Sequence, residues 1–445
     1  MRRYSNRGVV SLEEEGSSEV VAETTAPASV EAAEAEAEVT ESTVDGDDIA
    51  ADINEGVEVV EALESISDAL AISAKNGGMD KYSAQVVGIA TQYMYDRVGL
   101  RAKAMPSLES FGGSSTRIGA TQLAMEGIKE KAKELWEYIV KAYKKIIAWA
   151  TGHLRKLFGA AESMKKRAEA IAKSADDYRS KKVKDKTFDN AGLVKSLYVG
   201  NEVSAAKLKT SLTAIEGIAK IILDTKANEM VAQGEQIITA VETPGDNNSI
   251  GVVAKMVTTI KKPSDEFSKT NVDGGDMVWE STESLLGGFV WAERLPTKSG
   301  TTGLEQLSAF GKVKRGFMAD GGKKPTKESL TTLTVDEVES TAEAVGKIAE
   351  ILVDFKKTQD KLDQLLKKVV SAAEKMAKNA DNTVDAESAD ATKDQAEKDH
   401  GKFARSALDN IKGFVLNTFV SASTYPLKTG QAALSYCEQS LKHYE

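Results

Sequence analysis

Four tripeptides in this 445-residue sequence place a small residue, then leucine, then glutamate, in an order that a protease can recognise. They are Ser11-Leu12-Glu13, Ala62-Leu63-Glu64, Ser107-Leu108-Glu109 and Gly303-Leu304-Glu305, and serine follows the second and third, as Ser65 and Ser110. Proteases bind exposed, extended segments, which polar linkers supply. The third tripeptide lies in such a linker, residues 103–116, so we expect cleavage after Glu109, or else after Glu64. The alternative is chance, because helical Ala- and Glu-rich segments also produce such tripeptides.

No signature of catalysis accompanies these motifs. The sequence has no phosphate-binding Gly-Lys-Thr loop, no dinucleotide glycine pattern and no nucleophile elbow. Its one cysteine, Cys437, excludes an internal disulfide, and three scattered histidines predict no metal site. We therefore expect neither a cofactor nor enzymatic activity. The alternative is a hydrolase in the glycine-rich segment 264–325, whose candidate carboxylates are Asp265, Glu266, Asp273, Asp276 and Glu280.

Charge divides the chain at the same linker. Residues 1–109 hold 8 Lys and Arg against 22 Asp and Glu, a net charge of −14. Residues 110–445 hold 50 against 46, a net charge of +4. An acidic leader of this kind indicates a segment with a separate task.

The sequence predicts neither a secretory signal nor a membrane span. The basic first residues are not followed by an apolar run, and the sequence contains no stretch of 18 apolar residues.

Hydrophobic residues return every three or four positions over long stretches, which predicts amphipathic helices. The expected helices are 56–76, 82–99, 117–158, 160–182, 202–242, 249–262, 335–379, 402–422 and 428–443, with Thr334 as an N-cap and Pro426 separating the last two. Short apolar runs between glycines predict β-hairpins at 275–318. The predicted fold class is therefore mainly α, with long helices in a bundle or extended hairpin and a small β-rich insertion.

Five regions follow from charge and periodicity. Residues 1–55 form the N-terminal part of this acidic leader. It is expected to be disordered, because Ala, Glu, Val, Ser and Thr dominate residues 8–54 and no aromatic residue occurs there. The others are a helical remainder with the linker (56–109), a basic helical region (110–262), a Gly-rich β insertion (263–330) and a C-terminal helical region (331–445).

Basic residues outnumber acidic ones by 18 to 10 between residues 110 and 190. Such side chains neutralise nucleic-acid phosphates without reading sequence, although an ordinary solvated helix face is the alternative. The candidates are Lys141, Lys144, Lys145, Lys165, Lys166, Arg167, Lys181 and Lys182. An aromatic stripe of Trp136, Tyr143 and Trp149 is predicted to be core or a helix–helix interface, with an interfacial membrane helix as its alternative.

The two tripeptides ending at Glu64 and Glu109, together with the helical body and its closing segment Thr424-Tyr425-Pro426-Leu427, resemble the internal head and virion structural proteins of large, jumbo-type tailed phages. The resemblance implies an acidic propeptide that the prohead protease removes after a small-x-Glu motif. It also implies assembly in the host cytoplasm, a final place inside the phage head, and contacts with packaged DNA, with capsid or other head proteins and with further copies of the chain. The alternative function is an ejected virion protein that acts on a host membrane or another host target.

Overall fold

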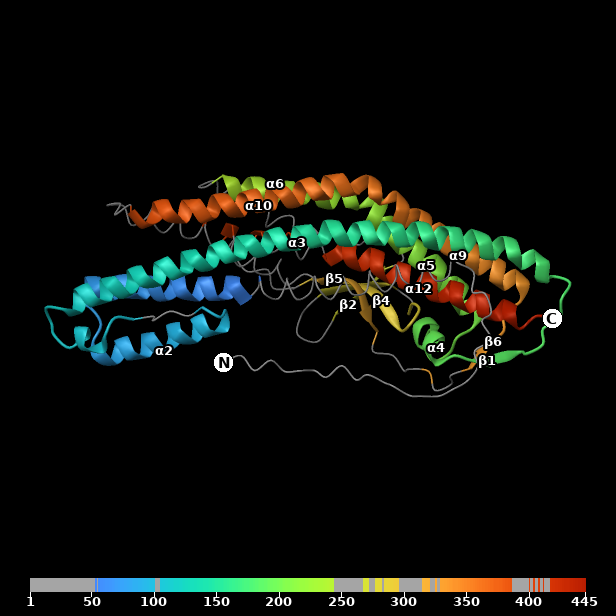
Figure 1. Cartoon of the computed structure of the whole chain (residues 1–445), viewed down its shortest axis with the longest axis horizontal. Coiled ribbons are helices and arrows are strands. Elements are labelled where there is room, and N and C mark those ends of the chain that lie inside the picture. Colours follow the sequence, from blue (N-terminus) through green and yellow to red (C-terminus); the bar gives the residue numbers. More distant parts are fainter. Residues whose placement is uncertain are drawn as a thin grey trace, which may run out of the picture.

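The computed structural model describes residues 53, 55–100, 105–243, 267–271, 277–281, 284–295, 314–320, 325, 329–385, 400, 403–404, 407–408, 411 and 417–445. Its central element is α3 (Arg117–Ala175), a helix of 59 residues that runs along most of the long axis of the molecule (Figure 1). Its apolar residues form one buried stripe, because they recur at helical spacing. The predicted break between 158 and 160 was wrong. Phe158 and Ala160 are both buried on either side of Gly159, and this packing offsets the ~1 kcal/mol that glycine costs inside a helix.

The C-terminal helices pack along α3. They are α9 (Val335–Asp354), which makes the most extensive contact, α10 (Lys356–Asp385) and α12 (Asn417–Lys442). The predicted single helix 335–379 is divided at Phe355, whose buried ring contacts Phe158 of α3 and Phe419 of α12.

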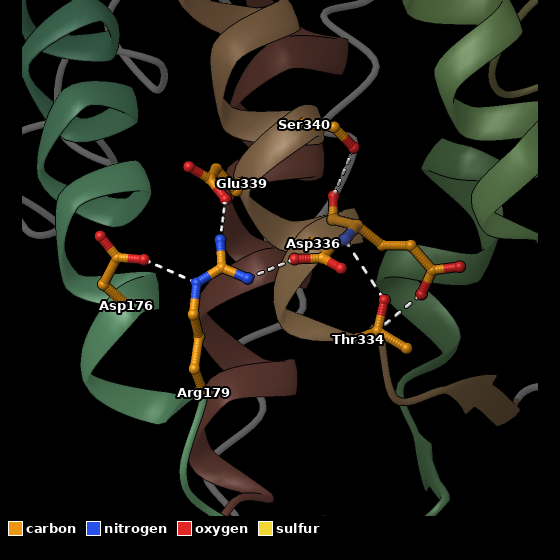
Figure 2. A network of polar contacts seen from close by, with 7 residues as sticks. Asp176, Arg179, Thr334, Asp336, Glu339 and Ser340 are labelled. Carbon is orange, nitrogen blue, oxygen red and sulfur yellow. Dashed lines mark hydrogen bonds and ion pairs between the residues drawn. The ribbon is translucent and has the colours of Figure 1, made fainter.

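The start of α9 is fixed from two directions (Figure 2). Thr334 is the N-cap, as predicted: its hydroxyl accepts from the backbone N–H of Glu337, whose carboxylate accepts from the N–H of Thr334 at 2.8 Å. Arg179, just beyond α3, makes ion pairs with Asp336 and Glu339 of α9. The end of α3 is thereby tied to the first turn of α9.

Helix α12 passes through Pro426 without ending, which corrects the predicted separation of 402–422 from 428–443. Proline removes one helical hydrogen bond and costs ~3 kcal/mol in a helix interior. The surrounding turns are buried against α3, α9 and α5 (Ala205–Ala219), and the Thr429 hydroxyl donates to the carbonyl of Tyr425 at 2.9 Å. Tertiary packing therefore holds the helix together. Most of 402–416 and all of 249–262 lie outside the described residues.

The predicted helix 202–242 consists of three parts. Helix α5 continues into a π-helical turn, η3 (Lys220–Thr225), and then into α6 (Ala227–Glu242). Helix α6 lies against α10, and Gly234 allows the close approach because a β-carbon there would meet the Leu365 side chain at 2.7 Å.

A four-stranded antiparallel sheet confirms the expected β insertion. Its order is β2 (Phe267–Asn271), β3 (Met277–Ser281), β4 (Phe289–Leu295), β5 (Lys314–Ala319). The sheet is anchored on α12, where the Phe317 ring stacks on Tyr425 with centroids 4.0 Å apart. A second pair, β1 (Thr187–Asp189) with β6 (Ser329–Thr331), and the short helix α4 (Ala191–Leu197) were not predicted.

The second half of the acidic leader is folded onto the N-terminal part of α3. Residues 55–75 are helical, followed by α2 (Lys81–Arg97) and the short 3-10 helix η1 (Leu108–Phe111), so both predicted helices, 56–76 and 82–99, are confirmed (Figure 1). Leu63, Tyr95 and Phe111 are fully buried and belong to the same hydrophobic core as the body. This part is therefore not a separate tail in the uncleaved chain. The segment 1–52 lies outside the described residues.

Candidate cleavage site and basic surface

The candidate site at Ser107-Leu108-Glu109-Ser110 lies in one short turn at the boundary of leader and body. Ser107 is extended (φ −55°, ψ 134°), and the 3-10 helix that follows is closed by bonds from the N–H of Ser110 to Ser107 O (2.9 Å) and of Gly112 to Glu109 O (3.0 Å). Glu109 is exposed, whereas Phe111 is buried and fixes the downstream side. An exposed run, 112–116, then leads to α3.

The second candidate, Ala62-Leu63-Glu64-Ser65, lies inside the helix of residues 55–75. Leu63 is fully buried, and the Ser65 hydroxyl donates to the carbonyl of Glu61 at 2.8 Å. A protease could bind this segment only after several helical turns had unwound and Leu63 had left the core. The tripeptides ending at Glu13 and Glu305 lie outside the described residues.

Seven of the eight predicted basic side chains are either exposed or held in ion pairs. Lys141, Lys145 and Lys166 are exposed along α3, and Lys181 and Lys182 are exposed just beyond it. Two others are held by ion pairs to neighbouring helices: Lys144 to Glu374 of α10 at 2.6 Å, and Lys165 to Glu350 of α9 at 2.8 Å. Those two lysines are therefore partly neutralised within the protein.

Arg167 was wrongly assigned to the basic surface. Its side chain is buried between α3 and α12, where the guanidinium binds Glu438, Gln431 and Ser435. A buried guanidinium whose donors are held by its own chain cannot contact DNA.

The exposed face of α3 contains basic residues that the sequence analysis missed. Arg155, Lys156 and Lys173 are exposed, and helical geometry places them within the same sector, about 100° wide, as Lys141, Lys145 and Lys166. Exposed Ala148 and Gly159 lie between them, and Glu162 and Glu169 lie at the edge of the sector. We call Lys141, Lys145, Arg155, Lys156, Lys166 and Lys173 the α3 basic face. It extends over ~50 Å, and plotting 141–173 at 100° per residue would have revealed it.

The aromatic stripe is part of the core, as predicted. Trp136 and Tyr143 are buried, and the partly buried Trp149 stacks on His153 with ring centroids 5.3 Å apart. The stripe is therefore not presented to a membrane in the folded chain. Within the described ranges, no helix combines the length and apolar character needed to cross a bilayer.

Four of the five carboxylates proposed for a hydrolase lie outside the described residues: Asp265, Glu266, Asp273 and Asp276. The fifth, Glu280, is in β3. Among the described residues, no group of three or more His, Cys, Asp or Glu side chains could hold a metal ion.

These features define a mainly helical protein built on one very long helix, with a leader folded onto its N-terminal end and a basic face along its outer side. A model of the family described as phiKZ-like phage internal head proteins matches residues 25–439. The chain therefore belongs to this family, whose members are structural proteins of the virion located inside the phage head. Neither a curated protein nor a solved structure matched the chain.

Proposed function

We propose that this internal head protein is made as a precursor, is cut after Glu109 by the head-maturation protease, and then lies beside the packaged DNA. The observation that carries the proposal is the position of Glu109, an exposed residue in a single 3-10 turn between the leader and α3. Opening one such turn costs far less than unwinding the buried helix around Leu63. Cleavage after Glu109 is therefore favoured over cleavage after Glu64.

Electrostatics supports the same position. Residues 1–109 have a net charge of −14, so their removal leaves a body with a net charge of +4. A negatively charged precursor is repelled by DNA during assembly, whereas a positive body tolerates a dense polyanion. Once the cut leader has left the body, the net charge of the protein changes from −10 to +4.

The α3 basic face supports contact with DNA through phosphates. Its side chains lie on one continuous helix and are separated by small residues, so a duplex could approach closely. Lysine and arginine side chains spread along an exposed helix neutralise phosphates without reading bases, and the expected binding is independent of sequence.

The N-terminus of the virion form tests the cleavage. Mass spectrometry of the protein from purified virions should find Ser110 as its first residue. A virion form that begins upstream of Glu64, or at Ser65, would contradict cleavage after Glu109.

DNA binding is tested on the virion form with reversed charges. Replacing Lys141, Lys145 and Lys166 with glutamate should weaken binding to any duplex and reduce the salt dependence, with a slope lower by about 0.9 for each phosphate that is no longer neutralised. The matched control carries glutamate at Lys195, Lys209 and Lys220, which are exposed residues outside α3. Equal weakening in the two variants would show that the α3 basic face has no special role.

A further inference from the structure

The outer side of α2 carries an apolar stripe that no other part of the described chain covers. Tyr82 is 75% exposed, Val86 50%, Ile89 65% and Tyr93 62%. Intervals of four, three and four residues place these side chains on one side of the helix. The opposite side, with Ala84, Thr91 and Tyr95, is buried against the protein itself. Contiguous apolar rows of this kind mark interaction surfaces.

The order of residue types along the stripe is the same from its N-terminal end as from its C-terminal end. An aromatic residue, two β-branched aliphatic residues and a second aromatic residue follow one another at symmetric intervals. A two-fold contact between identical chains requires such a self-complementary patch. If one residue of the first copy contacts a different residue of the second, the same two residues also meet with the copies exchanged. In an antiparallel pair, Tyr82 would meet Tyr93 of the second copy, and Val86 would meet Ile89.

The charges beside the stripe match the same arrangement. Lys81, Gln85, Gln92 and Asp96 all lie along one flank of the stripe, with the lysine at one end and the aspartate at the other. When two helices pack in opposite directions, equal flanks face each other, so Lys81 meets Asp96 of the second copy and Gln85 meets Gln92. Parallel packing would instead place like charges at each end.

We propose that α2 is a self-association surface through which the uncleaved precursor pairs with a second copy in an antiparallel, two-fold arrangement. Helix α2 is fixed to its own chain, since Arg97 binds Glu58 at 2.9 Å and Glu55 at 3.4 Å. The helix that carries the stripe is therefore held in place on its own chain. Because α2 precedes Glu109, cleavage there would break the covalent link between this interface and the body; that consequence rests on the proposed cleavage, whereas the pairing does not.

Sedimentation of the full, uncleaved chain tests the pairing. The wild-type chain should show a concentration-dependent equilibrium between monomer and dimer. The double variant Val86→Glu, Ile89→Glu should raise the dissociation constant about tenfold or more, because each glutamate faces a glutamate of the second copy. The control variant Ile72→Glu, Val183→Glu changes two exposed apolar residues outside α2 and should associate like the wild type.

Charge reversal tests the antiparallel direction. Lys81→Asp and Asp96→Lys should each weaken association, and the two together should restore it. Both substitutions place charges where the helix dipole favours them, so unfolding of α2 would not explain the loss. A wild-type chain that stays monomeric, a dimer unaffected by the glutamates in the stripe, or a double reversal that fails to restore association would each overturn the proposal. These experiments use the uncleaved chain, so their outcome is independent of whether Glu109 is processed.

Discussion

Arg167 of α3 and Glu438 of α12 form a two-point ion pair. The Nε of Arg167 donates to one carboxylate oxygen and its Nη2 to the other, both at 2.8 Å. Nη1 donates to the amide oxygen of Gln431 at 2.7 Å, and Nη2 also donates to the hydroxyl of Ser435 at 3.0 Å. Paired donors of this kind are the strong form of the hydrogen bond, and here they replace water around a buried charge. They fasten the C-terminal helix to α3.

Replacing Arg167 with alanine should lower the free energy of unfolding by about 2–3 kcal/mol, because Glu438 and Gln431 lose their donor. We take the lower end of the range for broken buried pairs, since Glu438 is partly exposed. Urea unfolding of the full chain measures the change. The adjacent exposed residue provides the control: Lys166→Ala should change the value by less than about 0.5 kcal/mol. Equal effects of the two substitutions would show that the buried network adds no stability.

A glutamate-specific protease should cut the folded chain after Glu109 well before it cuts after Glu64. The first bond lies in one 3-10 turn, whereas the second requires a buried helix to open. Mass spectrometry over time should find fragments that begin at Ser110 at least about tenfold faster than fragments that begin at Ser65. Glu109→Gln should remove the first product, and Glu64→Gln should leave it unchanged. Equal rates at the two bonds would contradict the structural ranking.

The cut leader should remain bound to the body after cleavage at Glu109. Its helices bury Leu63, Leu70 and Tyr95 in the shared core, and the backbone N–H of Met79 donates to the hydroxyl of Thr121 at 2.9 Å. The two fragments should therefore elute together under native conditions and separate in urea. Leu63→Ala should weaken their association by about 2–5 kcal/mol, the range for a buried leucine. Immediate release of the wild-type leader would show that this packing contributes little.

Stability should fall in mild acid because of His153. Burial lowers the pKa of this side chain to about 4, with smaller contributions from Lys156 and Lys428, and its Nδ1 has no hydrogen-bond partner among the described residues. Since the unfolded pKa is near 6.5, the contribution of His153 is complete above that pH and is lost as the pH falls towards 4. The loss should approach about 3 kcal/mol.

Urea unfolding at pH 7 and near pH 4 checks this expectation. The variant His153→Gln cannot take up the proton, so its stability should depend less on pH than that of the wild type. All other titrating groups are shared, and the difference between the two pH profiles therefore isolates His153. Superimposable profiles would exclude a neutral, buried histidine in the folded state.

Periodicity predicted most of the helices because each has one apolar face, but it misjudged where they end. Gly159 and Pro426 are helix breakers in isolation, yet both lie inside long helices whose neighbouring turns are buried. At Phe355 the reverse occurs: an unbroken apolar pattern hides a boundary, because the ring is packed between α3 and α12. Such boundaries depend on contacts between distant segments, which local sequence does not contain.

The candidate site was only partly predictable from sequence. The tripeptide ending at Glu109 is visible as a motif, whereas the burial of Leu63 follows from packing on α3. The error at Arg167 was avoidable. It lies three residues after Met164 and four before Ile171, both of which are buried, so helical spacing already placed it on the apolar face.

The length of α3 places the turn at Glu109 far from the C-terminal end of the chain. At 1.5 Å per residue, its 59 residues span ~90 Å between the turn at Glu109 and the opposite tip, where Lys182 and Glu445 exchange two backbone hydrogen bonds of 2.9 Å. Cleavage after Glu109 removes neither Lys182 nor Glu445, so the cut protein still contains both residues of this closing pair.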